Sequence, residues 1–97
     1  KGLSMYAASK GALQSFSKNI SREWGERGIR SNIVVPGYME TAMNAKLTAE
    51  HKSRIFKRTA LKKETDMQSV AETVMFLSDE RSRSITGQEI FVDSGTL

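Results

Sequence analysis

The sequence has 97 residues, the length of one small domain, and 38% of them are hydrophobic, which allows only a thin core. It has no cysteine and one histidine, which excludes disulfides, thiolate metal sites, thiol nucleophiles and histidine-rich metal sites. The histidine, His51, lies in a charged stretch and is expected at the surface, so no metal site is predicted.

The formal net charge is +4, from 15 basic and 11 acidic side chains. A basic chain raises the question of nucleic-acid binding. Its basic residues are mixed with acids, however, and their densest group contains one aromatic residue, Phe56, and no nucleic-acid motif. That group consists of Lys52, Arg54, Lys57, Arg58, Lys62 and Lys63. It is interpreted as a solvated face or a site for an anionic substrate, and no nucleic-acid partner is expected.

No apolar run approaches the length of a membrane span, and no signal peptide is visible. Together with the absence of cysteine, this fits a cytoplasmic protein without a membrane partner. The chain begins with Lys1 rather than methionine, and a predicted helix follows almost at once. The sequence is therefore expected to come from the middle of a longer protein.

A long helix is predicted from Ser4 or Met5 to about Trp24, with Ser4 as its N-cap. An apolar stripe runs along it, formed by Leu13, Phe16, Ile20 and Trp24. Gly11 inside this helix suggests the close approach of another backbone, because glycine there costs about 1 kcal/mol relative to alanine. Gly25 and Gly28 are expected to end the helix.

Two strands are predicted, over Ile33–Val35 and 88–92, with helices between them. The first is β-branched throughout and is expected to be buried on both faces, as in a parallel sheet, until Pro36 and Gly37 stop it. One or two short helices are expected over 41–59, and an amphipathic helix that ends near Asp79 is expected after a cap at Asp66 or Ser69. This order favours an α/β fold with a parallel pair of strands. A ligand would then bind beyond the first strand, at 36–41.

Tyr6 and Lys10 lie four residues apart on the first helix and therefore share one face. A tyrosine phenol ordinarily has a pKa of about 10, and a nearby ammonium lowers it toward the range useful for acid–base catalysis. The pair is a candidate proton donor and its tuning cation. Taken alone, it is more typical of an amphipathic tyrosine beside a solvated lysine.

Segments along the whole chain carry a resemblance to one family. They are Tyr6–Leu13, which contains a Tyr-x-x-x-Lys pattern, Ile29–Asn32, Val35–Gly37 with Thr41, Phe76–Asp79, Ile85–Gln88 and Val92–Gly95. In this order they resemble the C-terminal part of the classical short-chain dehydrogenase/reductase family, and most closely its 3-oxoacyl-[acyl-carrier-protein] reductase branch. The resemblance implies the C-terminal portion of a Rossmann-like doubly wound parallel sheet. It also implies an NADP- or NAD-dependent oxidoreductase that acts on a ketone or secondary alcohol.

The resemblance assigns roles by position. Tyr6 would be the general acid/base, and Lys10 would lower its pKa and bind the nicotinamide ribose. The backbone of Pro36, Gly37 and Met39 would line the nicotinamide, and the Thr41 hydroxyl would reach its carboxamide or a phosphate. Residues 42–58 would form a substrate lid, and the enzyme would be a homo-oligomer acting on a small or carrier-bound carbonyl substrate.

Simpler readings stand beside these roles. Pro36-Gly37 can be a plain turn, Thr41 can cap the next helix, and Asn32 can be a strand-end residue. Three departures from the family pattern leave the substrate open. Ala60-Leu61-Lys62-Lys63 stands where Pro-Leu-Gly-Arg is usual, Met67-Gln68 where Pro-Glu is usual, and Asp93-Ser94-Gly95 where Asp-Gly-Gly is usual.

The glycine-rich turn that binds a dinucleotide pyrophosphate is missing from the sequence. Two strands are also too few for a doubly wound sheet. Residues 1–97 are therefore expected to be the C-terminal fragment of one dinucleotide-binding domain whose N-terminal half is absent, and to be inactive alone. The alternative is a non-catalytic fragment that associates with itself or serves as an interaction module.

Overall fold

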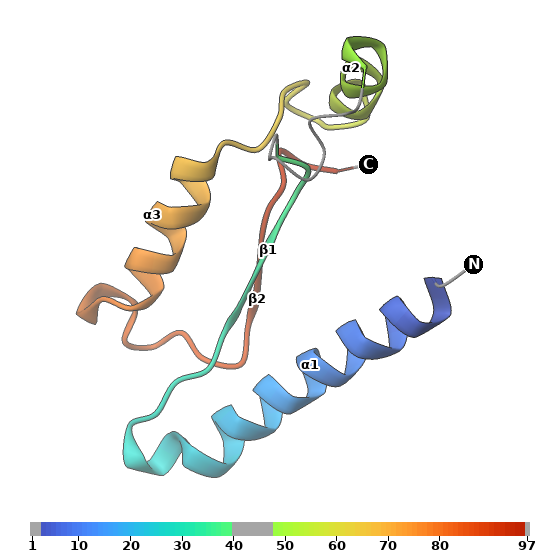
Figure 1. The fold of residues 1–97 in the computed structure, drawn as a ribbon. Helices are drawn as coiled ribbons and strands as arrows, with labels where there is room; N and C mark the ends of the chain where they lie inside the picture. Colours follow the sequence, from blue (N-terminus) through green and yellow to red (C-terminus); the bar gives the residue numbers. More distant parts are fainter. Residues whose placement is uncertain (1–2, 40–47, 97) are drawn as a thin grey trace. The chain divides into compact units, whose positions relative to one another are not determined.

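The structure is a computed structural model in which residues 3–39 and 48–96 are described. In chain order the elements are α1 (Leu3–Trp24), the 3-10 helix η1 (Gly25–Arg27), β1 (Ile33–Pro36), α2 (Ala49–Lys57), α3 (Met67–Leu77), the 3-10 helix η3 (Glu80–Ser82) and β2 (Glu89–Val92) (Figure 1). The chain divides into two compact units. The first unit holds the residues up to Ile33 and Leu77–Ile90, and the second holds Val34–Phe76 and Phe91 onward.

The two strands pair in a two-stranded sheet and lie side by side in Figure 1. The amide of Ile33 donates to the carbonyl of Gln88, and the amide of Gly37 donates to the carbonyl of Val92. Both partners advance by four residues in the same direction, so the sheet is parallel and the predicted α/β class is confirmed. The expected burial of this strand on both faces was wrong. Residues Ile33–Val35 are only half-buried, because the described elements are too few to cover both faces.

Helix α1 has the predicted extent, and it ends where glycine was expected to end it. Gly28 takes a left-handed conformation, with φ of +79°, and its amide donates to the carbonyl of Gly25. The predicted N-cap was wrong, since the helix begins at Leu3 and Ser4 lies inside it. A methyl group at Gly11 would meet nothing within 4 Å among the described residues, so this chain makes no close backbone approach there.

A polar face of α1 makes its contacts within the first unit. Gln14 Nε2 donates to Glu89 Oε1 over 2.8 Å, and the hydroxyls of Ser17 and Ser31 lie 2.7 Å apart. The predicted apolar stripe is largely exposed instead, with Leu13 57% and Phe16 62% accessible. Hydrogen bonds therefore hold this side of α1 to its own unit, while Leu13 and Phe16 of the stripe stay exposed.

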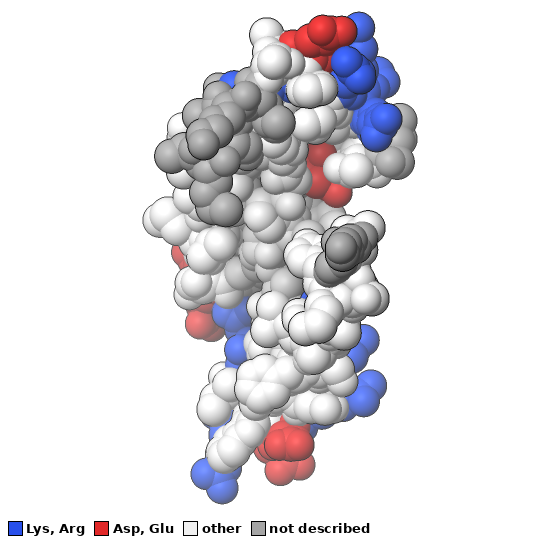
Figure 2. Space-filling view, turned by 45° about the vertical axis from the view of Figure 1, so that its right-hand side comes forward, with Lys and Arg blue, Asp and Glu red and all other residues white. Residues whose placement is uncertain are grey.

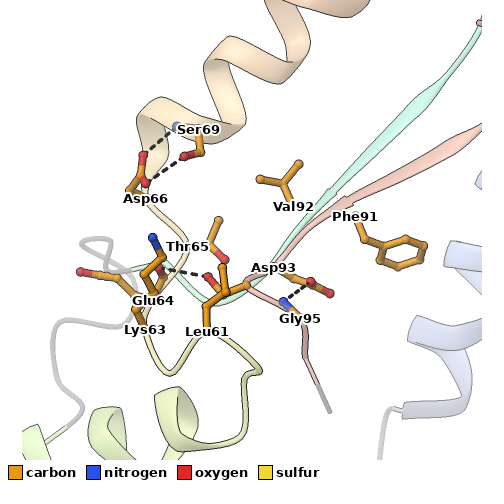
Figure 3. A pocket seen from close by; sticks show the side chains of 11 residues that line it. Leu61, Lys63, Glu64, Thr65, Asp66, Ser69, Phe91, Val92, Asp93 and Gly95 are labelled. Atoms are coloured by element: carbon orange, nitrogen blue, oxygen red, sulfur yellow. Dashed lines mark hydrogen bonds between the residues drawn. The ribbon is translucent and has the colours of Figure 1, made fainter.

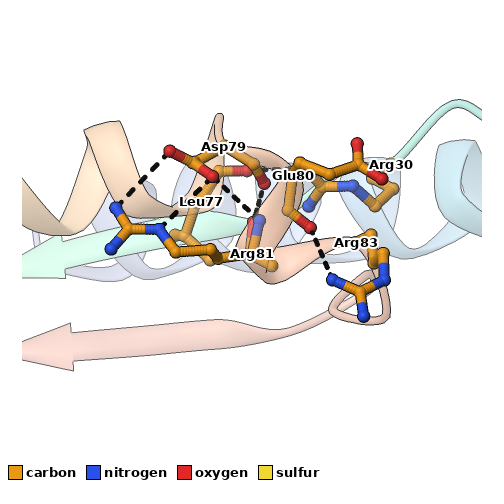
Figure 4. A network of polar contacts seen from close by, with 7 residues as sticks. Arg30, Leu77, Asp79, Glu80, Arg81 and Arg83 are labelled. Atoms are coloured by element: carbon orange, nitrogen blue, oxygen red, sulfur yellow. Dashed lines mark hydrogen bonds and ion pairs between the residues drawn. The ribbon is translucent and has the colours of Figure 1, made fainter.

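Arg30 and Asn32 hold the first unit together just before β1. The Arg30 guanidinium donates to the carbonyls of Leu77, the last residue of α3, and Ile85, over 2.8 and 3.0 Å (Figure 4). Asn32 donates to the same Ile85 carbonyl and accepts from the Gln88 amide. These bonds support the simpler reading of Asn32 as a strand-end residue.

Side-chain caps define the helices of the second unit. Thr48 accepts a hydrogen bond from the His51 amide at the start of α2, and His51 is exposed as predicted. Asp66 caps α3 by accepting from the amide and the hydroxyl of Ser69 over 2.7 and 2.9 Å. Asp66 was one of the two predicted caps, and the other candidate, Ser69, is its hydrogen-bond partner.

Among the described residues no hydrophobic side chain is fully buried; the buried side chains are Ser17, Thr59, Thr65 and Ser82. Within the same ranges no helix has the length and apolar character needed to cross a membrane. The described chain thus has regular elements and specific polar contacts but no hydrophobic core of its own.

Candidate active site

Tyr6 and Lys10 occupy successive turns of α1, in the first unit. Residues four apart on a helix lie on one face, and Gln14 and Ser17 continue the same row. Those two side chains contact Glu89 and Ser31. The row that carries Tyr6 and Lys10 is therefore the row that faces the start of β2 in this unit.

The two candidate catalytic residues differ in exposure. Tyr6 is 66% exposed, whereas Lys10 is half-buried. A phenol can donate or accept a proton, and an ammonium supplies three donors and a positive charge. One accessible phenol beside a partly sheltered cation is a suitable arrangement for moving a proton to or from a bound oxygen.

Pro36, Gly37 and Met39 lie within four residues at the carboxyl end of β1, in the second unit. A Cβ on Gly37 would lie 2.7 Å from Thr65 Oγ1 and 2.8 Å from Cα and Cβ of Asp93. Residue 37 is therefore glycine because its backbone is pressed against two other segments. This close packing supports a loop that is held in a specific position, rather than a plain Pro-Gly turn.

Tyr38, which stands between Gly37 and Met39, anchors this loop to α2. Its ring lies 5.8 Å from the ring of Phe56, and its carbonyl accepts from the Thr65 amide. The hydroxyls of Tyr38 and Thr65 are buried, and neither has a hydrogen-bond partner within residues 3–39 and 48–96. Thr41 and lid residues 42–47 lie outside the described residues, and the described part of the predicted lid is α2.

An open hollow of about 260 Å³ lies beside the start of α3, and Thr65, Asp66 and Asp93 are among the residues that line it (Figure 3). The Asp66 carboxylate already accepts from the Ser69 amide at the start of this helix. Hydrogen bonds from the amide and then the hydroxyl of Ser69 hold the pKa of Asp66 below its ordinary value, with Lys63 adding a smaller favourable charge. The chain's own carboxylate is therefore the side-chain cap of this helix.

The predicted site residues thus divide between the units, with Tyr6 and Lys10 in one and the loop of Pro36, Gly37 and Met39 in the other. Sequence reasoning missed the two neighbours of Gly37. Asp93 belongs to a recognisable strand-ending motif, so a signal for it existed. Thr65 carries no comparable signal. In the described stretches no group of three or more His, Cys, Asp or Glu side chains is placed to hold a metal ion.

Comparisons with known proteins match nearly the whole chain. Residues 1–96 match the family model described as enoyl-(acyl carrier protein) reductase. The chain is 35% identical over 94 residues to 3-oxoacyl-[acyl-carrier-protein] reductase FabG of Escherichia coli, covering 97% of this chain and 38% of that protein. It is 34% identical to carbonyl reductase [NADPH] 2 of Sus scrofa, covering 99% of this chain and 40% of that protein.

The fold comparison agrees. A solved structure of 4-hydroxyisoleucine dehydrogenase complexed with NADH matches with a TM-score of 0.86 and 28% identity, over 93% of this chain and 38% of that one. The chain spans about two fifths of the length of the curated relatives it matches. With the Tyr-x-x-x-Lys helix and the parallel strand pair in place, the chain belongs to the short-chain dehydrogenase/reductase family.

Proposed function

We propose that this chain is the C-terminal part of an NAD(P)-dependent oxidoreductase that interconverts a ketone and a secondary alcohol, with a 3-oxoacyl thioester as substrate. The observation that carries the proposal is the Tyr6–Lys10 pair on α1, within a chain that is 35% identical to a 3-oxoacyl-[acyl-carrier-protein] reductase. Relatives named for NADPH and NADH support either nicotinamide cofactor. The N-terminal half of the dinucleotide-binding domain would lie outside these residues.

The residues present fit the nicotinamide end of such a cofactor. Tyr6 and Lys10 supply donors for ribose hydroxyls, and the tightly held backbone at Gly37 suits close approach to a flat ring. Among the described residues, no counterpart is found for the pyrophosphate end. At the described starts of α2 and α3 one backbone amide each is already bound by the capping oxygen of Thr48 or Asp66, and the chain has no glycine-rich turn. The chain alone is therefore proposed to be inactive.

A bound nicotinamide would supply or accept the hydride. Tyr6 would give its phenolic proton to the carbonyl oxygen as that oxygen becomes an alkoxide, and would take the proton back in the reverse direction. Lys10 would stabilise the phenolate and hold a ribose hydroxyl. Main-chain groups of Pro36, Gly37 and Met39 would orient the ring, and the Thr41 hydroxyl would hold its carboxamide or a phosphate.

The test is Tyr6→Phe in the intact protein that contains this chain. Turnover of a 3-oxoacyl thioester should fall by roughly 10³-fold or more, as expected when the proton donor is lost, while cofactor binding stays near wild type. Tyr38→Phe is the matched control, because it removes one hydroxyl from the only other tyrosine, whose ring packs on Phe56. Unchanged turnover in Tyr6→Phe would refute the role.

A second test uses the 97 residues alone. Trp24 is 40% exposed and stacks with the Arg27 guanidinium, so its fluorescence can report a bound cofactor. No saturable quenching by NADPH is expected. Saturable quenching would show that the pyrophosphate-binding half is not required.

Self-association is proposed as a property of the enzyme and is also the alternative function of the fragment. Leu3, Met5, Leu13 and Phe16 on α1 and Phe91 on β2 are between 57% and 75% exposed, and exposed apolar surface of this kind favours a partner. Sedimentation of the intact protein should give a homo-oligomer. A strict monomer at all concentrations would remove both the oligomer and the alternative function.

A further inference from the structure

Helix α2 has little apolar burial of its own in the second unit. Within residues 49–57 no side chain is fully buried. Figure 2 shows basic side chains gathered over α2, which carries Lys52, Arg54 and Lys57. A nine-residue helix is only marginally stable by itself, so its position depends on specific contacts with the rest of its unit.

Thr59, just after the helix, makes one of these contacts and is only 7% exposed. Its hydroxyl donates to the carbonyl of Phe56 over 2.8 Å and accepts from the Lys63 amide over 3.2 Å. Phe56 in turn packs its ring against Tyr38, in the loop beyond β1. The Thr59 hydroxyl therefore fixes the last turn of α2 to the turn that follows it.

That turn also pairs with the segment after β2. An antiparallel bridge joins Thr59 and Thr96, and the amides of Ala60 and Leu61 donate to the carbonyls of Gly95 and Ser94 over 2.7 and 3.0 Å. Gly95 has φ of +75°, and a Cβ there would lie 2.7 Å from the Cβ of Ala60, so glycine permits this close pairing. Residues 59–61 and 94–96 together are called the α2 anchor.

Asp93 joins the α2 anchor to the loop beyond β1. It directly precedes the anchor, and its Oδ1 accepts from the Gly95 amide over 2.9 Å. A Cβ on Gly37 would lie 2.8 Å from Cα of Asp93. Residues 93–96 thus contact both Gly37 and the turn after α2, all within the second unit.

We propose that the α2 anchor sets the position of α2 for substrate binding and that Thr59 is a positioning residue within it. The proposal rests on the proposed function, with α2 as the described part of the predicted substrate lid. When the anchor opens, α2 leaves the position that contacts substrate, and the apparent affinity falls with the fraction of molecules that are binding-competent. Such a loss raises KM and leaves kcat unchanged.

The experiment uses the intact protein that contains this chain. Thr59→Val keeps the branched shape but removes the hydroxyl, and should raise KM for a 3-oxoacyl thioester about two- to fivefold, with kcat and cofactor binding near wild type. Thr59→Ser keeps the hydroxyl and should restore the wild-type KM. Thr73→Val is the matched control, because the Thr73 hydroxyl donates to the Ser69 carbonyl over 2.8 Å on α3, in the same unit. It should leave KM unchanged.

Gly95→Ala tests the α2 anchor from its other side. The added methyl group should raise KM as Thr59→Val does, because it meets the Cβ of Ala60. Adding Ala60→Gly to this variant removes that Cβ and should bring KM part of the way back. No recovery in the double variant would count against the proposal.

Hydrogen exchange separates this proposal from the proposed function, because it needs no turnover. The α2 amides should exchange faster in Thr59→Val than in the wild type, with the α3 amides unchanged, and Thr73→Val should show the reverse. If the wild type turns over no thioester, the proposed function fails while the exchange of α2 still tests the anchor. Wild-type exchange at α2 in Thr59→Val, an unchanged KM, or an equal rise in Thr59→Ser or Thr73→Val would overturn the positioning role.

Discussion

In the part of the chain that the structure describes, two non-glycine residues adopt left-handed backbone angles, Lys62 with φ of +57° and Ser94 with φ of +58°. Both stand where the family pattern has glycine, in Pro-Leu-Gly-Arg and in Asp-Gly-Gly. This conformation costs a residue with a Cβ about 1 kcal/mol or more. Lys62 recovers part of that cost because its ammonium binds the last carbonyl of α2, a favourable place for a cation. Among the described residues, the Ser94 hydroxyl makes one side-chain hydrogen bond, a long one of 3.4 Å to the Glu64 carbonyl.

Ser94→Gly is therefore expected to stabilise the intact protein by about 0.5–1 kcal/mol, because glycine removes the strain and little bonding is lost. Its neighbour provides the opposite control. Gly95 has φ of +75°, and a Cβ there would lie 2.7 Å from that of Ala60, so Gly95→Ala should destabilise. Urea unfolding measures both changes. A destabilising Ser94→Gly would mean that the serine hydroxyl contributes more than its long bond indicates.

Gly37→Ala tests the close backbone contact beyond β1. The added methyl group would meet Thr65 Oγ1 and the Asp93 backbone at 2.7–2.8 Å, so the loop or its neighbours must move. Overpacking of this kind typically costs about 1–3 kcal/mol. The midpoint of urea unfolding should fall accordingly, whereas Gly25→Ala, which meets nothing within 4 Å among the described residues, should leave it near wild type. Equal midpoints for the two variants would contradict the packing described here.

At the scale of elements, local signals were sufficient for the helices and strands. The extent of α1, the glycines that end it and the Asp66 cap could all be predicted, because each depends on residues within one or two turns. The surroundings of each element could not be predicted from local sequence. Leu13 and Phe16 form a clear stripe, yet it is the row of Gln14 and Ser17 that contacts Glu89 and Ser31. Which face of a helix is covered depends on segments distant in the sequence.

The Asp66 cap makes the stability of α3 depend on pH in acid. Hydrogen bonds from the Ser69 amide and hydroxyl lower the pKa of Asp66 in the folded state, so folding favours the carboxylate. Its contribution is fully present above the ordinary carboxyl pKa of about 4 and is lost as the pH falls through the lower folded value. Asp66→Asn keeps an oxygen for the cap but does not titrate.

Hydrogen exchange of the α3 amides should therefore show weaker protection in acid for the wild type than for Asp66→Asn, relative to each protein at pH 7. Asp66→Ala should be less protected than both at neutral pH, because its cap is lost. Asp79, whose pKa is lowered by the Arg81 amide and side chain, is present in all three proteins and cancels in the comparison. Parallel acid profiles for wild type and Asp66→Asn would show that the carboxylate charge is not involved.

At the scale of the whole molecule, the features that identify the family and those that stabilise the chain are different. The Tyr6–Lys10 helix and the parallel strands are in place, but they are joined by polar contacts such as Gln14–Glu89 and Arg30–Ile85. Each such hydrogen bond contributes only about 0.5–1.5 kcal/mol net. Apolar burial normally supplies the larger part of folding free energy. Here no described hydrophobic side chain is fully buried, and Leu3, Met5 and Met75 are more than 70% exposed.

The 97 residues alone are therefore expected to lack a cooperative unfolding transition. Heating should give a broad loss of helix signal, and a dye specific for exposed apolar surface should bind before heating. The near-ultraviolet signal of Trp24 should be weak, because a chain without a fully buried hydrophobic side chain among its described residues gives the ring no fixed surroundings. The intact protein should instead unfold sharply and leave the dye unbound, since additional chain or a second copy would cover the α1 stripe. Calorimetry of the isolated chain, at a concentration where sedimentation shows a monomer, distinguishes a broad transition from a cooperative one. A sharp transition with equal calorimetric and van't Hoff enthalpies would show that these residues form a domain of their own.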